Sequence, residues 1–118
     1  MRVKIYHYKN CSTCKNALKF LNSKGIESEA VDITETPPTM AELKAMLAHY
    51  DGNVKKLFNT SGEVYRAQKL GEKLVDMSDP EALKLLAATG KLVKRPFLMV
   101  GGKPAAVGFK ADEWRELF

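Results

Sequence analysis

Two cysteines are the residues of this sequence best suited to chemistry. Cys11 and Cys14 are the only cysteines among 118 residues, and they form a CxxC pair with Ser12 and Thr13 between them. A secreted protein held together by disulfides would space several cysteines along its chain, so the pair is not such a framework. Thiol redox sites instead use one thiolate to attack and a second cysteine to resolve the mixed disulfide. The spacing therefore favours a redox site.

The elements expected around the pair give the two cysteines different environments. Residues 2–8 alternate and are rich in Val, Ile and Tyr, which predicts a strand. The next positions follow helical spacing, with one apolar face at Cys14, Ala17, Leu18 and Leu21. Cys11 then lies at the helix start, where free N–H groups and the helix dipole stabilise a thiolate. Cys14 faces inward, so we expect Cys11 to attack and Cys14 to resolve.

Two other interpretations of the cysteine pair remain open. A structural zinc site needs about four ligands, and besides the pair the sequence offers only His7 and His49. An inert pair of small buried side chains is also typical of free cysteines, although Cys11 has polar neighbours. We favour redox or anion chemistry, with no bound metal and no bound cofactor.

The strands predicted at the two ends of the chain belong to one sheet. Residues 27–33 alternate as a second strand, so the two strands and the helix between them form a βαβ unit with parallel strands. Residues 96–100 and 104–107 flank Gly101-Gly102, which is typical of a hairpin turn. Four strands are therefore expected, in a mixed sheet.

The middle of the chain, from about 39 to 90, predicts a block of helices. Thr39 and Glu42 form a capping box that begins a helix ending near His49, and residues 60–63 are a second capping candidate. Ser78 begins a third helix, with Pro80 in its first turn and Gly90 after its end.

The C-terminal residues 110–118 predict a last helix, which we expect to bury Trp114 and Leu117. The complete order describes an α/β fold with a four-stranded mixed sheet, flanking helices and a helical insertion between the second and third strands. No repeat or linker divides the sequence, so residues 1–118 are expected to form a single domain.

Composition and charge exclude several classes of function. No apolar run approaches the roughly 18 residues that span a bilayer, and residues 1–6 resemble a strand rather than a signal peptide. We therefore expect a cytoplasmic protein without a membrane partner. The net charge is +5, but acidic and basic residues are interleaved, which argues against direct nucleic-acid binding. We expect a monomer.

Three stretches together resemble the signature of a known family. Residues 6–16 read Tyr-His-Tyr-Lys-Asn-Cys-Ser-Thr-Cys-Lys-Asn, residues 94–98 read Lys-Arg-Pro-Phe-Leu, and residues 107–109 read Val-Gly-Phe. In this order they resemble arsenate reductases of the glutaredoxin-coupled type and their Spx-like relatives, and the resemblance covers essentially the whole chain. It implies a thioredoxin-like fold, with the CxxC directly after the first strand, and a small thiol-based oxidoreductase.

The resemblance also implies roles for individual residues. Cys11 matches the family's nucleophile, and Arg95 matches the arginine that binds the oxyanion, because a guanidinium fork suits a tetrahedral anion. Pro96 matches a proline that is generally cis, and Gly108 a close-approach glycine. The further positions implied in substrate binding are His7, Asn10, Ser12, Thr13, Lys15 and Arg66. His7 is equally explained as a strand histidine with an ordinary hydrogen bond.

Two departures from the arsenate-reducing pattern favour thiol exchange. That pattern typically has a non-Cys residue at Cys14, Arg at Lys15, and a more fork-like basic residue than Lys110 after the last hairpin. The implied reductant is glutathione, glutaredoxin or thioredoxin. The alternative is an Spx-like regulator that senses oxidation and binds RNA polymerase, which Gly52 also suggests. A third alternative only binds a small anion near Arg95.

Overall fold

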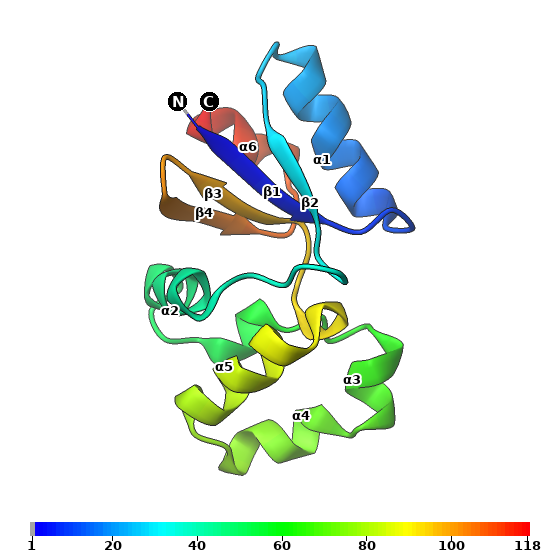
Figure 1. Ribbon diagram of the computed structural model, residues 1–118, viewed down its shortest axis with the longest axis vertical. Helices are drawn as coiled ribbons and strands as arrows, with labels where there is room; N and C mark the ends of the chain where they lie inside the picture. Colours follow the sequence, from blue (N-terminus) through cyan, green and yellow to red (C-terminus); the bar gives the residue numbers. More distant parts are fainter. Residues whose placement is uncertain (1) are drawn as a thin grey trace.

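The computed structural model describes residues 2–118, and a mixed sheet with strand order β2-β1-β3-β4 forms its centre (Figure 1). The strands are β1 (Val3–His7), β2 (Glu29–Asp32), β3 (Phe97–Val100) and β4 (Lys103–Val107). β1 pairs with β2 in parallel and with β3 antiparallel, and β3 pairs with β4 antiparallel. The predicted four-stranded mixed sheet, with its βαβ unit and C-terminal hairpin, is confirmed.

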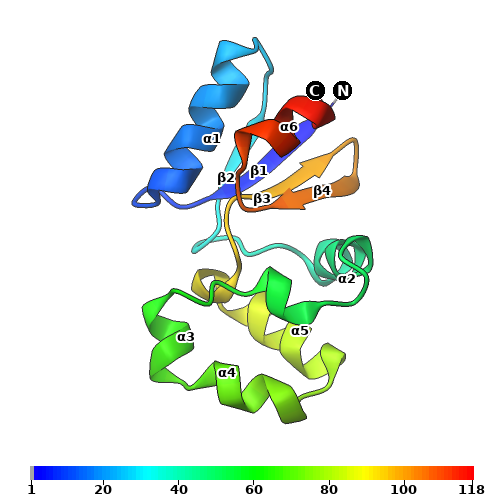
Figure 2. The ribbon, with the colours of Figure 1, turned by 180° about the vertical axis from the view of Figure 1, so that it is seen from behind.

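Helices cover both faces of the sheet. α1 (Ser12–Ser23) and α6 (Ala111–Leu117) lie on one face, and a block of helices lies on the other, as Figures 1 and 2 show. The block contains α2 (Met40–His49), η1 (Val54–Leu57), α3 (Glu63–Ala67), α4 (Leu70–Lys73), η2 (Leu74–Asp76), α5 (Asp79–Ala88) and η3 (Gly90–Leu92), where η denotes a 3₁₀ helix. None of the helices in residues 2–118 is long and apolar enough to cross a membrane.

Alternation along the strands divides the core between these two layers. Ile5 and Leu98 pack with α1 and with the fully buried Trp114 of α6. Their chain neighbours Tyr6 and Phe97 point to the other face, because successive side chains of a strand alternate, and join the core of the helical block. The rings of Tyr6 and Phe97 meet edge to face with centroids 5.7 Å apart. The sheet is therefore buried on both faces around the strand that leads to Cys11.

Most of the local signals in the sequence form the predicted structures. The Thr39–Glu42 capping box begins α2, and the Ser78 side chain accepts a hydrogen bond from the backbone of Glu81 at the start of α5. Gly101 and Gly102 adopt φ values of +60° and +77° in the hairpin, a conformation that suits glycine because it has no Cβ.

Two local predictions are wrong. Residues 60–63 form no side-chain cap, because Gly62 is the N-cap of α3 and its amide closes a turn on the carbonyl of Asn59. Leu117 is 38% exposed, although Trp114 is buried as expected. Phe118 packs against Trp114 in its place, with ring centroids 6.5 Å apart.

Gly90 joins the helical block to the sheet by a close backbone approach. It is buried, and a Cβ built on it would lie 1.7 Å from the carbonyl oxygen of Ile33. The sequence marked Gly90 only as the end of a helix, whereas the structure gives it a contact with the chain that leaves β2. Only glycine fits there, because any side chain would overlap that carbonyl.

Glu42 anchors the start of α2 to the sheet. Its carboxylate accepts hydrogen bonds from Tyr6 Oη at 2.5 Å and Lys4 Nζ at 3.3 Å, in addition to the Thr39 amide of the capping box. Burial acts to raise the pKa of Glu42, but these hydrogen bonds and the charge of Lys4 outweigh it and lower the pKa. The ionised carboxylate therefore stabilises the folded state.

We expect a Glu42→Gln variant to lose about 1–2 kcal/mol of unfolding free energy at neutral pH, because glutamine retains the cap but not the charge. The pKa of Glu42 is lower in the folded state than in the unfolded chain, where it is about 4.3. The stabilisation of the folded state by the ionised carboxylate is therefore complete above about pH 4.3 and is lost as the pH falls through the pKa of the folded state. Urea unfolding at pH 7 and at pH 3 measures the difference. An equal difference at both pH values would contradict the assignment.

Candidate active site

Cys11 lies where the chain passes from β1 into α1. Its amide donates a hydrogen bond to the carbonyl of Tyr8 at 3.0 Å, which closes the turn after the strand. Cys11 is the N-cap residue of α1, with an extended backbone (φ −97°, ψ 113°). The predicted position at the start of a helix is confirmed, and the residue is partly exposed.

The sulfur of Cys11 occupies the place of a capping oxygen. Cys11 Sγ accepts a hydrogen bond from the Cys14 amide at 3.3 Å, the bond that Ser, Thr or Asp usually accepts at an N-cap. The free N–H groups and the positive end of the helix dipole favour negative charge at this position. The Cys11 sulfur therefore lies at the positive end of α1 and stays partly exposed.

Cys14 has the opposite environment. It is 0% exposed and lies on the same face of α1 as the buried Ala17 and Leu21. Burial, followed by a hydrogen bond with the Cys11 side chain, raises the pKa of Cys14 to about 12. Cys14 is therefore a protonated, shielded thiol within hydrogen-bonding reach of the partly exposed Cys11. The predicted inward orientation is confirmed.

Arg95 brings a positive charge to the cysteine pair. It precedes β3, and its peptide bond to Pro96 is cis. The guanidinium carbon lies 4.8 Å from the centre of the Tyr8 ring, and the charge of Arg95 acts to lower the pKa of Cys14, although burial outweighs it. Arg95 Nη1 is buried without a hydrogen-bond partner. A guanidinium with an unsatisfied N–H is suited to binding an anion, because burying an unpaired donor is costly.

Gly108 ties the end of β4 to the loop that carries Arg95. Its amide donates to the carbonyl of Pro96 at 2.8 Å, and its carbonyl accepts from Trp114 Nε1 at 3.2 Å. Its φ of +77° allows this turn. Three segments far apart in the sequence, around residues 8–14, 94–96 and 107–110, are therefore held together at one end of the sheet.

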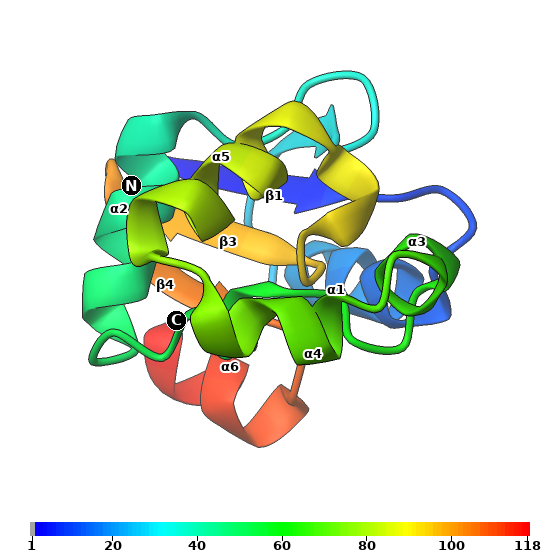
Figure 3. The same ribbon diagram turned by 90° about the horizontal axis from the view of Figure 1, so that it is seen from below.

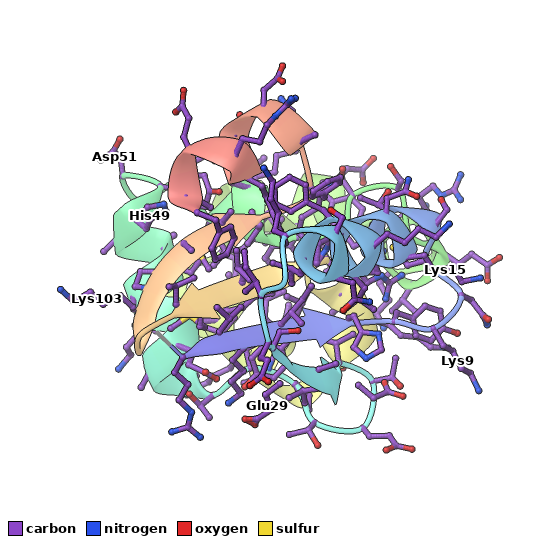
Figure 4. All side chains as sticks on the ribbon, turned by 90° about the horizontal axis from the view of Figure 1, so that it is seen from above. Lys9, Lys15, Glu29, His49, Asp51 and Lys103 are labelled. Atoms are coloured by element: carbon purple, nitrogen blue, oxygen red, sulfur yellow. The ribbon has the colours of Figure 1, made fainter. Side chains whose placement is uncertain are left out.

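Some of the other predicted site residues lie near the pair. Asn10 is exposed and donates from Nδ2 to Tyr8 Oη at 3.4 Å. Ser12, Thr13 and Lys15 are exposed on the first turn of α1. Figure 4 shows Lys15 and Lys9 projecting outward on the side of the molecule where α1 begins.

Two predicted site residues have other surroundings. His7 ends β1 opposite Asp32 of β2, and its charge is one of the influences that lower the pKa of Asp32, after the hydrogen bonds from Thr34. Arg66 is exposed on α3 within the helical block. Figures 1 and 3 show α3 on the same side of the molecule as the start of α1, in a different layer.

A basic cleft beside the cysteine pair was missing from the sequence predictions. Its volume is about 620 Å³, and its lining includes Thr13 of the CxxC turn, four lysines and one acidic residue, Glu113. The lysines are Lys55, Lys56, Lys94 and Lys110. They come from η1, the loop before β3 and the start of α6, so no local pattern in the sequence could have grouped them. Within residues 2–118, no three His, Cys, Asp or Glu side chains gather to hold a metal ion.

Comparisons with known proteins place these features in a family. The model of the ArsC family matches residues 6–117. The uncharacterized protein YusI of Bacillus subtilis is 45% identical over 116 residues, and the match covers 98% of this chain and 98% of YusI. An arsenate reductase of Rhizobium meliloti is 33% identical, over 84% of this chain and 69% of its own length.

A regulator and a solved structure are also similar to this chain. The global transcriptional regulator Spx of Enterococcus faecalis is 29% identical, over 94% of this chain and 82% of its own length. A crystal structure from Streptococcus mutans, described as that of an arsenate reductase candidate, has a TM-score of 0.91 at 37% identity and covers 98% of both chains. The thioredoxin-like fold expected from the sequence is confirmed.

Proposed function

Because the chain belongs to the ArsC family, we propose that it is a small thiol oxidoreductase in which Cys11 is the nucleophile and Cys14 the resolving cysteine. The observation that carries this proposal is the asymmetry of the pair. Cys11 is a partly exposed N-cap sulfur, whereas Cys14 is buried and protonated beside it. Attack and resolution are thereby assigned to different sulfurs.

With a disulfide substrate, the Cys11 thiolate attacks one sulfur and forms a mixed disulfide. The substrate's S–S bond breaks, and its second sulfur leaves as a thiolate that takes a proton from solvent. Cys14 then loses its proton to solvent and attacks Cys11 Sγ, which releases the first substrate sulfur and leaves a Cys11–Cys14 disulfide. The protein has given two electrons to the substrate. An external thiol of the glutathione, glutaredoxin or thioredoxin class restores the dithiol.

With arsenate, the unsatisfied N–H of Arg95 would bind the oxyanion beside Cys11. The Cys11 thiolate attacks arsenic, and one arsenate oxygen leaves as water after protonation. A second thiol then attacks Cys11 Sγ, so that the two sulfurs become a disulfide while As(V) takes the electron pair and leaves as As(III). Cys14 or an external thiol supplies that second sulfur. Both substrates therefore use the same nucleophile, and only the oxyanion requires Arg95.

Trapping the mixed disulfide tests the division of labour between the cysteines. After one equivalent of a small disulfide is added, wild-type protein should form an intramolecular disulfide. Its mass should be that of the reduced protein minus two hydrogens, with no substrate attached. A Cys14→Ser variant should instead retain half of the substrate on Cys11, because it lacks the resolving sulfur. Intact-mass spectrometry distinguishes the two products. Substrate retained on Cys14 in a Cys11→Ser variant would contradict the assignment.

A second candidate function is that of an Spx-like redox-sensing regulator that docks on RNA polymerase. Similarity to the Spx regulator of Enterococcus faecalis supports it, and Gly52, with φ +79°, lies exposed in the turn after α2 where a partner could reach it. Affinity capture with purified RNA polymerase, under reducing and oxidising conditions, tests it. Equal and negligible binding in both states would exclude this function.

A further inference from the structure

The basic cleft beside the CxxC turn is built from parts that fix its shape. The Lys94 amide donates to the carbonyl of Leu57 at 2.7 Å, which holds the loop before β3 against η1. Tyr50 Oη accepts from the Val107 amide at 3.0 Å and so joins the end of α2 to the end of β4. Two walls of the cleft are therefore tied together by hydrogen bonds between distant segments.

The charged side chains around the cleft are arranged on these walls. Lys94 Cε lies 3.4 Å from the point where a Cβ on Gly108 would be. The side chain of Lys94 therefore runs along the wall of the cleft formed by the end of β4. Lys56 Nζ lies 5.4 Å from the centre of the Tyr50 ring, and Lys55 and Lys110 complete the basic lining. Glu113 supplies the one negative charge among the lining residues. The buried Phe58 and Val107 give the cleft an apolar part.

The cleft and the cysteine pair share the first turn of α1. Thr13, which lines the cleft, stands between Cys11 and Cys14 in the sequence. Arg95 lies over Tyr8 beside the pair, whereas the neighbouring Lys94 lines the cleft. The cleft therefore lies next to the turn that carries the two cysteines.

We propose that this cleft binds the anionic part of a small thiol or disulfide substrate and selects such substrates for Cys11. The inference rests on the proposed function and names its substrate class. A cleft of about 620 Å³ has the size of small-molecule sites, which span about 300–1,000 Å³. Lysine ammonium groups are flexible point charges, so they select for negative charge rather than for one geometry. Electrostatic attraction into a basic cleft raises the association rate of an anion.

Two chromogenic disulfides of different charge test the proposal. The dianionic probe is 5,5′-dithiobis(2-nitrobenzoate), and the neutral probe is 4,4′-dithiodipyridine; stopped-flow absorbance gives the rate of each with the reduced protein. The test variant changes Lys55, Lys56, Lys94 and Lys110 to Gln. The control variant changes four exposed lysines outside the cleft to Gln, namely Lys44, Lys73, Lys84 and Lys103. Both variants lose the same net charge.

The cleft variant should lose about tenfold or more of its rate with the dianionic probe at low salt and less than about twofold with the neutral probe. The control variant should keep the wild-type ratio of the two rates within about twofold. Raising the salt concentration should shrink the difference between wild type and cleft variant. The four single variants, each with a smaller loss, provide the same comparison if the quadruple variant folds poorly.

The failure of this inference is distinct from the failure of the proposed function. Equal rate ratios in the cleft and control variants, with the neutral probe still reacting at Cys11, would overturn the anionic subsite alone. Unchanged rates with both probes in a Cys11→Ser variant would instead overturn the nucleophile assignment.

Discussion

A Cys11→Ser variant is expected to reduce disulfides and arsenate at least about a thousandfold more slowly than wild type. Replacing a catalytic nucleophile removes the covalent step altogether, and a serine hydroxyl does not ionise at neutral pH as a thiol can. Serine is also a preferred N-cap residue, so it preserves the hydrogen bond from the Cys14 amide that Cys11 Sγ now accepts. The loss of activity should therefore occur without a loss of structure.

Steady-state rates with an external thiol and each substrate measure this effect, and thermal unfolding of the same sample is the control. An unfolding temperature within a few degrees of wild type shows that the rate reflects chemistry. Residual turnover above one per cent of wild type would contradict the assignment of Cys11.

An Arg95→Lys variant should separate the two substrates. It should slow arsenate reduction about tenfold and leave the rate of disulfide reduction within about twofold of wild type.

A Gly90→Ala variant is expected to be the least stable single substitution in the helical block. The added Cβ would lie 1.7 Å from the carbonyl oxygen of Ile33 and 2.7 Å from its carbonyl carbon. Overpacking in a core costs about 1–3 kcal/mol and occasionally more, and here the obstructing atoms are backbone that has no alternative rotamer. We expect a loss of at least about 3 kcal/mol and a fall in Tm of about 10 °C or more.

Urea and thermal unfolding measure the loss, and Gly71→Ala is the matched control in the same block. Gly71 is exposed in α4, and its nearest atom to a built Cβ is Tyr65 Oη at 3.4 Å, an ordinary contact. Alanine is favoured over glycine in a helix by about 1 kcal/mol, so this variant should equal or slightly exceed wild-type stability. Similar losses in the two variants would show that the contact of Gly90 with Ile33 is unimportant.

The layers of the fold could be predicted because their signals are local. The alternation around Ile5 and Tyr6 and the helical spacing of Cys14, Ala17 and Leu21 each lie within one element, and both have the predicted form. The prediction that Leu117 is buried was wrong because helical spacing alone does not show which side chain covers Trp114. Phe118 contacts Trp114 there, and Leu117 faces solvent.

The candidate site divides in the same way. The contrast between Cys11 and Cys14 follows from their places on one helix, so the sequence predicted it directly. The approach of Arg95 to Tyr8 brings together residues from the two ends of the chain, and only the resemblance to a family indicated it. The lysines of the cleft come from three segments that meet through hydrogen bonds such as that from Val107 to Tyr50, which no periodicity in the sequence reveals.

The contact between Gly90 and Ile33 has a consequence for how such proteins can diversify. Ile33 begins the segment that leads from β2 into the helical block, and Gly90 begins η3 at the other end of the block. The close contact between these two residues brings the ends of the block together. An insertion with adjacent ends can change in length or composition without moving the elements that flank it. Lys55 and Lys56 belong to the helical block, whereas Cys11 lies between β1 and α1, outside it. A change of residues in the helical block can therefore alter the charge of the cleft without moving the CxxC turn.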